Sequence, residues 1–595
     1  MTSKNTAQVE QDRTRLAEAN RHGWLAKLTV FTRLTGPGWI ASAITLGGGS
    51  LASSLYLGVL GGYSLMWLQP FAMVLGVIML SAIGYVTLST GERPFQAINA
   101  HVSPVLGWGW ALAVAAANVI WCMPQFSLAH GVLSQNLLSG WLGADGSLPQ
   151  WAASAFSSET PVGAWFSTNF DEVAVSMALL VVCTFVTWSY DRGGWGVRIY
   201  ETVLKIVVAV IVLCFLGVVL RLSFSSEPLP WGAVLAGLVP DFGQFWTPAA
   251  TFTPFLEAIE NESARAFWFD TIVNEQRDVM ISAAATAVGI NMTLLFPYAM
   301  LRKGWTKEFR GLSIFDLSTG LFIPYILATG FVVIAAASRF HTELPAGFVA
   351  ETSGGKLTIV ADENSPKYGA YQGLLAKRNA VLTSVDITSP APDQTTAPDL
   401  SENEKLMAAI LVRRDAMDLA TSLEPLTGKV IANIVFGLGV LAMVLSTISI
   451  LMLISGFVFA EMMAFPPGGW MHKLGTLVAG VGGIFWPIFW TGQSKFYLAV
   501  VTSVFGFMLL PFAYVTFVLL MNSKSLLQEE MPRGFSRFLW NVLMIFAALT
   551  ASVGAAYMIW VKARWGGIVA VALFVLLVVM VYFNRRNEQS SRRGD

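Results

Sequence analysis

Twelve stretches of about 20 mainly apolar residues follow one another along this chain, and they constrain its fold more than any other feature. A run of that length crosses a lipid bilayer as one helix, because hydrocarbon offers the backbone no other hydrogen-bond partners. Only 12% of the residues are charged, about half the share usual in soluble proteins. We therefore expect an all-α polytopic membrane protein with about twelve transmembrane helices. The expected spans are 36–60, 64–89, 107–136, 172–190, 199–221, 278–299, 312–338, 429–459, 473–491, 496–521, 537–561 and 566–583.

The Lys and Arg residues of the short loops predict the orientation of these spans. They cluster after the sixth span, before the eleventh and in the C-terminal tail, whereas the loop 137–171 has none. By the positive-inside bias that loop is external and both termini are cytoplasmic. Net charge is zero, so we expect no nucleic-acid partner. The expected partner is the lipid bilayer.

The spacing of the spans predicts the domain organisation. The expected segments are a cytoplasmic N-terminal tail (1–35), a first five-helix repeat (36–221), an external cap segment (222–277), a second five-helix repeat (278–521) containing an external insert (339–428), two last helices (522–583) and a cytoplasmic tail (584–595). Within the insert, Ser-Pro-Ala-Pro at 389–392 reads as a linker and 402–422 as an amphipathic helix. We expect the insert to be a passive addition and regard the cap as the candidate lid.

Three consecutive glycines interrupt the first span halfway. Gly47, Gly48 and Gly49 are followed by the hydroxyls of Ser50 and Ser53. A break at mid-depth is tolerated where the freed backbone groups line a cavity or meet a ligand. The alternative is close packing of a neighbouring helix against small residues. We favour a binding site and include Thr45, the polar residue that precedes the three glycines.

The sixth span carries a second candidate break. Gly289, Ile290, Asn291 and Thr293 lie at mid-depth, and Pro297 removes a backbone donor. Paired breaks in the first and sixth spans are typical of transporters built from two inverted five-helix repeats, whose substrate lies between the breaks. Expected substrate-binding residues are thus Thr45, Gly47, Gly48, Gly49, Ser50, Ser53, Ile290, Asn291 and Thr293.

Few polar residues lie elsewhere in the expected core. His130 is the one ionisable residue placed there, on the third span with Asn118 and Gln125. Packing is one role for this histidine, and proton coupling with Gln125 and Asn118 is the other. We find no motif for catalysis, cofactor binding or a Cys/His metal cluster, so we expect neither an enzyme nor a cofactor.

Several short motifs, in order along the chain, resemble the Nramp (natural resistance-associated macrophage protein-like) metal transporter family. They are Gly-Pro-Gly at 36–38, Gly-Tyr-Ser-Leu-Met-Trp at 62–67, Ser-Thr-Gly-Glu at 89–92, Gly-Ala-Val-Leu-Ala-Gly-Leu-Val-Pro at 232–240 and Leu-Pro-Phe-Ala at 510–513. Leu-Arg-Lys-Gly-Trp at 301–305 and Phe-Asp-Leu-Ser-Thr-Gly at 315–320 resemble a divergent bacterial branch. The resemblance implies the leucine-transporter-like fold of the APC superfamily, in a bacterial inner (plasma) membrane.

The departures from the family concern its metal ligands. The family's Asp-Pro-Gly-Asn falls on Gly47–Ser50, and its Met-Pro-His on Thr293, Leu294 and Leu295, so both carboxylate and thioether ligands are expected to be missing. The family's acidic proton-relay pair falls near Gln125 and Leu128. No Asp or Glu lies at mid-depth in the expected spans, and a dehydrated divalent ion would be poorly compensated there. The start of a helix after Gly49 instead offers free amide donors for an anion or carboxylate.

These observations favour an alternating-access secondary transporter for a small polar neutral or anionic solute, coupled to an ion such as H⁺ or Na⁺. The alternative is a divalent metal transporter, of manganese or magnesium, that uses backbone and hydroxyl oxygens. A third possibility is a transporter-like receptor that binds a ligand without accumulating it. Under the first hypothesis, Gly47→Asp should create metal binding absent from the parent protein.

Overall fold

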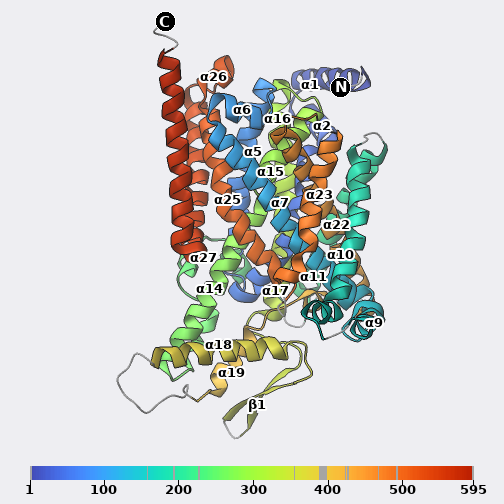
Figure 1. The fold of residues 1–595 in the computed structure, drawn as a ribbon, viewed down its shortest axis with the longest axis vertical. Helices are drawn as coiled ribbons and strands as arrows, with labels where there is room; N and C mark the ends of the chain where they lie inside the picture. The colour runs from blue at the N-terminus through green and yellow to red at the C-terminus, as the bar shows by residue number, and fades with distance from the viewer. Residues whose placement is uncertain are drawn as a thin grey trace.

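The computed structural model describes the chain except residues 1–2, 157–158, 192–194, 226–227, 354–355, 387–398, 422–423, 425–427, 467, 491–493 and 592–595. The described part is a bundle of long, roughly parallel helices (Figure 1). The helices of this bundle are α3 (Pro37–Thr45), α4 (Gly48–Gly61), α5 (Leu68–Thr90), α7 (Pro104–Val132), α10 (Pro161–Asp191), α11 (Trp195–Ser223), α14 (Glu262–Ala287), α15 (Met292–Arg302), α16 (Arg310–Leu317), α17 (Ile323–Phe340), α22 (Lys429–Met462), α23 (Trp470–Ile484), α25 (Tyr497–Met521) and α27 (Gly534–Ser591).

Shorter elements connect and cover the bundle. The short α-helices are α1 (Ser3–His22), α2 (Trp24–Leu34), α6 (Pro94–His101), α8 (Ser139–Leu142), α9 (Ser147–Ala155), α12 (Trp231–Ala236), α13 (Thr253–Glu257), α18 (Tyr368–Asp386), α19 (Glu402–Ile410), α20 (Ala416–Thr421), α24 (Trp486–Phe489) and α26 (Lys524–Leu527). The 3₁₀ and π turns are η1 (Leu133–Leu137), η2 (Phe242–Phe245), η3 (Ala250–Phe252), η4 (Lys307–Phe309), η5 (Ser318–Phe322) and η6 (Gln528–Glu530). One antiparallel hairpin pairs β1 (Phe348–Ser353) with β2 (Lys356–Ala361).

The described residues contain 8 helices long and apolar enough to cross a membrane, or 9 when a bent pair counts as one span. Each of the twelve expected spans coincides with helix, but α23 has only 15 residues. The last two expected spans form α27, in which Arg564 has non-helical backbone angles. The all-α polytopic fold is thus confirmed.

The two ends of the chain lie on one side of the bundle, and the segment containing β1, α18 and α19 lies on the other (Figure 1). We call these the terminal side and the insert side. The N-terminal tail is helical, as α1 and α2, where the sequence indicated only a polar tail. Arg13, in the middle of α1, connects this helix to the bundle, because its guanidinium donates to Thr306 Oγ1 at 3.1 Å.

The cap segment is only partly separate from the membrane body. Its short elements α12, η2, η3 and α13 match the expectation of short helices. The expected end of the cap at residue 277 is wrong, however. Helix α14 begins at Glu262 and continues without interruption to Ala287. Asn261 caps this helix by accepting from the amide of Ala264 at 2.9 Å.

The insert is also more structured than its sequence indicated. Instead of one helix over 402–422, α19 ends at Ile410 and α20 begins at Ala416, with an irregular turn between them. Ser401 and Glu404 form a capping box that fixes the start of α19. The linker expected at 389–392 lies outside the described residues.

Candidate solute pocket between two broken helices

The first span is broken as its glycines indicated. Helices α3 and α4 meet at an angle of 53°, and Gly47 between them is extended (φ −87°, ψ −176°). A side chain would not fit at Gly47 or Gly48, where an added Cβ would lie 2.5 Å from Thr447 Oγ1 and 2.2 Å from Leu128 Cδ1 respectively. These two glycines therefore admit close neighbours, which is the packing role considered as the alternative, and neither of them lines the pocket described below.

The second break separates α14 from α15. The chain is extended at Val288 (φ −141°, ψ 100°) and re-enters a helix after Asn291. The first amides of α15 are satisfied locally: those of Met292 and Thr293 donate to the carbonyls of Gly289 and Ile290 at 3.0 and 3.2 Å. The α15 terminus therefore offers few free donors, in contrast with the start of α4.

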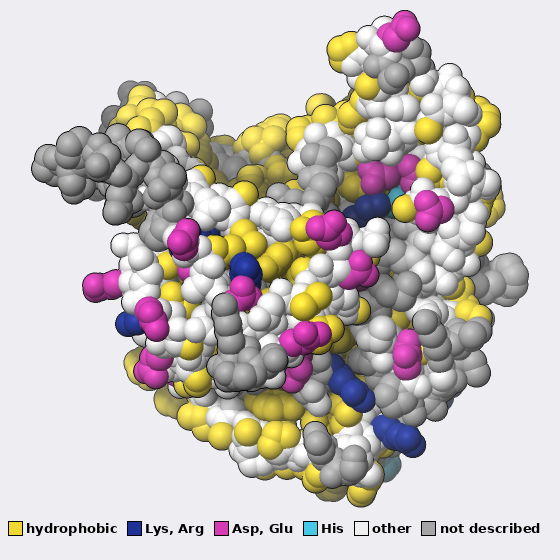
Figure 2. Space-filling view, turned by 90° about the horizontal axis from the view of Figure 1, so that it is seen from below, with side chains coloured by type: hydrophobic (Ala, Val, Ile, Leu, Met, Phe, Trp, Pro, Cys, Tyr) yellow, Lys and Arg dark blue, Asp and Glu magenta, His cyan; other side chains and the backbone are white. Residues whose placement is uncertain are grey.

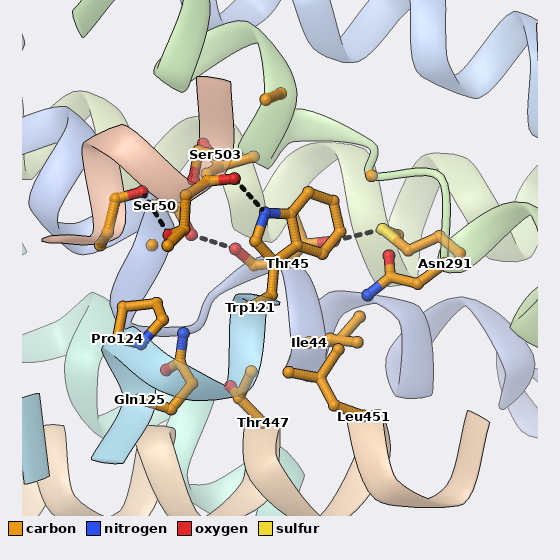
Figure 3. A pocket seen from close by; sticks show the side chains of 17 residues that line it. Ile44, Thr45, Ser50, Trp121, Pro124, Gln125, Asn291, Thr447, Leu451 and Ser503 are labelled. Carbon is orange, nitrogen blue, oxygen red and sulfur yellow. Dashed lines mark hydrogen bonds between the residues drawn. The ribbon is translucent and has the colours of Figure 1, made fainter. Parts of the chain in front are cut away.

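A small pocket lies where the two breaks meet (Figure 3). Its volume is about 50 Å³, enough for a few ordered water molecules. The lining comes from α3, α4, α7, α14, α22, α25 and the second break. It consists of Ile44, Thr45, Gly49, Ser50, Trp121, Pro124, Gln125, Ala285, Thr286, Gly289, Asn291, Met292, Thr447, Leu451, Ala499, Thr502 and Ser503. We call this the central pocket.

The polar groups of the central pocket are held by neighbouring backbone. Thr45 Oγ1 donates to the carbonyl of Ala41 at 2.9 Å and lies 3.0 Å from the sulfur of Met292. Ser50 Oγ donates to the carbonyl of Thr45 across the first break. Gln125 Oε1 accepts from the amide of Gly48 at 3.3 Å. In Figure 3 the Asn291 amide extends from the second break toward the same space.

None of the residues that line the central pocket carries a charge. Within the described ranges, no group of three His, Cys, Asp or Glu side chains could hold a metal ion. The soft thioether thought to be missing is nevertheless present, because Met292 lines the pocket. The resemblance had placed the family's methionine position one residue further on, at Thr293. The hydroxyl of Thr293 accepts from Trp110 Nε1 at 2.9 Å and donates to Ile290 O.

The remaining predicted site residues do not line the central pocket. Ser53 Oγ pairs with Ser282 Oγ at 2.8 Å, and Ile290 is fully buried. Asn118 is also buried, and neither of its side-chain polar atoms has a hydrogen-bond partner in the protein. The sequence thus located the pocket through Thr45, Gly49, Ser50, Gln125 and Asn291.

His130 is not an isolated ionisable residue, contrary to our expectation. Its Nε2 lies 2.7 Å from Asp171 Oδ2 and its Nδ1 lies 2.7 Å from Lys495 Nζ. Lys495 also pairs with Glu172 at 2.9 Å. We call these four residues the His130 cluster. Asp171 and Lys495 come immediately before the fourth and tenth expected spans, and Glu172 is the first residue of the fourth, so the sequence placed all three at span ends.

The His130 cluster borders a second cavity of about 880 Å³ on the insert side. The insert contributes Lys367, Asp415 and Asp418 to the walls of this cavity. Figure 2 looks onto this face of the molecule, where acidic, basic and histidine side chains gather in one hollow. His130 is five residues from Gln125 on α7, which is about 7.5 Å along the helix axis.

A carboxylate fixes the broken first span on the terminal side. The two oxygens of Asp316, at the end of α16, accept from the amides of Gly36 and Gly38 at 3.0 and 2.7 Å. These amides belong to the start of α3, where a negative charge interacts favourably with the helix dipole. Asp316 is completely buried.

The fold and the two facing breaks define a polytopic helical membrane protein of leucine-transporter-like architecture. Its backbone resembles that of a manganese transporter from Eremococcus coleocola, solved in complex with an aromatic bis-isothiourea substituted compound. The TM-score is 0.55 at 13% sequence identity, over 93% of this chain and 94% of the other. At that identity the likeness concerns the fold.

Sequence comparison finds similarity to one family over part of the chain. Residues 406–561 match the model of natural resistance-associated macrophage protein-like (Nramp) proteins. A metal transporter from Populus trichocarpa, Nramp2, is 29% identical over 129 residues, which is 21% of this chain and 22% of that protein. The similarity to Nramp proteins therefore covers about a quarter of the chain by sequence, and the chain spans 22% of the length of the curated relative. The match to the family model includes α22 and α25 but neither helix break, so the part of the pocket most altered from the family's ligand pattern lies outside the matched residues.

Proposed function

We propose that this chain is a secondary transporter that binds its solute in the central pocket and exposes that pocket alternately to the two sides of the membrane. The position of the pocket between two broken helices supports this proposal, because irregular backbone at mid-depth is tolerated where it lines a cavity. Both termini are assigned to the cytoplasm of a bacterial cell and the insert to the outside, on the loop charges.

We infer that the solute is small, polar and neutral or anionic. The observation that carries this inference is the absence of a charged side chain among the lining residues. The amides of Gly49 and Ser50 begin α4, whose N-terminal end favours negative charge or a carbonyl oxygen. The side chains of Gln125 and Asn291 add amide donors and acceptors to the same lining, so a neutral polar molecule fits it as well. The volume of about 50 Å³ favours a molecule of a few non-hydrogen atoms.

A divalent metal ion is the second candidate, and Met292 is the observation that favours it. A thioether together with the Asn291 amide and the hydroxyls of Thr45 and Ser50 would form a neutral ligand set for a transition metal. A carboxylate normally accompanies such ligands around a doubly charged ion. The lining offers none, and for this reason we rank the metal second.

We further propose that the His130 cluster couples transport to protons. Histidine and carboxylate side chains within a membrane protein are the usual carriers of coupled protons. The cluster lies between the insert-side cavity and α7 of the central pocket, where a proton would pass on the same route as the solute.

Uptake into proteoliposomes tests this function. Bicarbonate, small carboxylates and amino acids are supplied beside manganese and magnesium, with and without a proton gradient. We expect saturable, gradient-driven accumulation of one non-metal solute, weakened several-fold by Ser50→Ala and unchanged by Ser89→Ala, a half-buried serine on α5. Saturable manganese uptake would establish the metal alternative, and binding without accumulation would indicate a receptor.

A further inference from the structure

The turn of the insert between α19 and α20 enters the insert-side mouth of the membrane body. This turn, Leu411–Asp415, contains two consecutive arginines, and Arg414 is only 1% exposed. We call it the plug. The insert was expected to be passive, but the plug contacts three helices of the bundle.

The backbone of the plug binds the broken first span. The carbonyl of Arg414 accepts from Tyr56 Oη at 2.6 Å and from Ser494 Oγ at 3.2 Å. Tyr56 belongs to α4 and lies six residues beyond Ser50 of the central pocket, about 9 Å along the helix. Ser494 lies next to Lys495 of the His130 cluster. One carbonyl of the insert thus joins α4 to the segment that leads into α25.

The side chain of Arg413 binds the other two helices of the mouth. Its guanidinium carbon lies 3.4 Å from the ring centre of Tyr497, at the start of α25. A guanidinium nitrogen pairs with Glu275 Oε1 of α14 at 3.2 Å. The ring of Tyr497 packs edge-on against Tyr56 at 5.3 Å between centres. Helices α4, α14 and α25 are therefore connected through the plug.

The second guanidinium of the plug is held by the insert's own backbone. Arg414 donates to the carbonyls of Glu343 and Val412, so the plug keeps its shape. Behind it, Arg378 of α18 forms a buried bidentate pair with Glu404 of α19 at 2.7 and 3.0 Å. Trp268 Nε1 of α14 donates to the same carboxylate at 3.4 Å. The insert is a rigid support fixed to α14, from which the plug extends.

The three helices that the plug connects are the ones that supply Gly49, Thr286 and Ser503 to the central pocket. A solute that comes from the insert side must separate their ends. We propose that the plug is a tethered lid, which withdraws from Tyr56, Tyr497 and Glu275 whenever the pocket opens to the insert side and returns when it closes. This inference rests on the alternating access proposed above, but its test requires no solute.

The test measures access to a cysteine placed beneath the plug. Ser127 is fully buried on α7, and its hydroxyl donates to the carbonyl of Lys495 at 3.4 Å. Ser127→Cys is introduced after the native cysteines Cys122, Cys183 and Cys214 are replaced by alanine. A charged, membrane-impermeant methanethiosulfonate reagent is added to oriented vesicles from the insert side, and the rate of labelling is measured.

We expect slow labelling with the native plug and a rate at least about tenfold higher with Arg413→Ala, because the closed state loses a salt bridge and a cation–π contact. Arg413→Glu and Glu275→Arg should each raise the rate, and the double exchange should restore slow labelling. Lys405→Ala, which removes an ion pair on α19 away from the mouth, is the control. Equal rates in all variants would overturn the proposal, as would an equal increase with Lys405→Ala. Loss of solute uptake with labelling as expected would count against the proposed function alone.

Discussion

The sulfur of Met292 and the hydroxyl oxygen of Thr45 lie 3.0 Å apart, across the gap between the two broken helices. Each residue sits at a helix end, Thr45 closing α3 and Met292 opening α15. The contact joins the two halves of the molecule at the central pocket. It also places a soft donor atom where the resemblance to metal transporters predicted none.

Met292→Leu distinguishes packing from metal ligation. Leucine conserves most of the side-chain volume, so a sulfur that only packs should be replaceable at a cost below about 1.5 kcal/mol. We expect solute uptake to change less than about threefold. Proteoliposome uptake and thermal unfolding of the variant provide the measurement. A complete loss of uptake with unchanged stability would contradict the packing role and support a sulfur ligand.

Gly49→Asp should create a manganese site that the parent protein lacks. An added Cβ at Gly49 meets only Thr286 Cγ2 at 3.2 Å and Ser503 Oγ at 3.7 Å, and a carboxylate at the start of α4 is favoured by the helix dipole. Titration calorimetry with manganese should detect binding in the variant alone. Gly47→Asp, the change that the sequence favoured, serves as the contrast because its Cβ would clash with Thr447. Tight manganese binding by the unmodified protein would refute the ranking of candidate solutes.

Asp171→Asn should uncouple transport from protons. The amide keeps the size of the carboxylate but cannot carry the charge that pairs with His130 at 2.7 Å. We expect uptake driven by the solute gradient to persist, whereas acceleration by an imposed proton gradient disappears. Asp241→Asn, in the exposed cap segment, is the control and should retain the acceleration. An unaltered proton dependence in Asp171→Asn would exclude the His130 cluster from coupling.

Docking of the plug should weaken as pH rises. Burial, and next the negative charge of Asp418, raise the pKa of Asp415 to about 6, while Lys367 acts in the opposite direction. The ordinary carboxyl pKa is 3.8, so the docked plug favours the protonated form, and this stabilisation is lost between pH 3.8 and about 6. Labelling of Ser127→Cys should therefore be slower at pH 5 than at pH 7.5, after correction for the reactivity of an exposed cysteine. Asp415→Asn should remove the difference, and a difference that persists in that variant would assign it to another group.

Asp316→Ala should release α3 on the terminal side. Two buried amides lose their acceptor, each at a cost of about 1–3 kcal/mol. We expect a lower unfolding temperature and faster labelling of Thr45→Cys from the terminal side. Asp316→Asn should be intermediate, because its amide oxygen can still accept one of the two hydrogen bonds. Faster labelling from the insert side instead would show that the carboxylate acts on the other half of the molecule.

The elements that followed from local physics could be predicted from the sequence. Apolar runs located the spans, and glycines located both breaks. Pro297, which was expected to contribute to the second break, lies inside α15 instead. The pocket residues Thr45, Ser50 and Asn291 followed, because helix breaks determine which side chains meet. The roles of Gly47 and Gly48 could not be predicted, because the sequence does not show whether a glycine is needed for the approach of a ligand or of a side chain such as Leu128.

The residues missed by the sequence are those whose partners are distant along the chain. Asp171 and Lys495 are separated from His130 by 41 and 365 residues, and no local pattern indicates such contacts. The plug was missed for a related reason. The pattern of 402–422 is amphipathic throughout, but the contact of Arg413 with Tyr497 and Glu275 ends the helix at Ile410. Tertiary contacts there override the local helical preference.

Helix α14 extends from the insert to the central pocket in a single piece. Its 26 residues form a rod about 39 Å long, which holds Trp268 against Glu404 of the insert near one end and Thr286 against the central pocket near the other. A small tilt of this lever about its middle would move both ends at once and in opposite directions. A molecule that binds the outer part of the insert could therefore change how the central pocket binds its solute, without itself contacting the pocket.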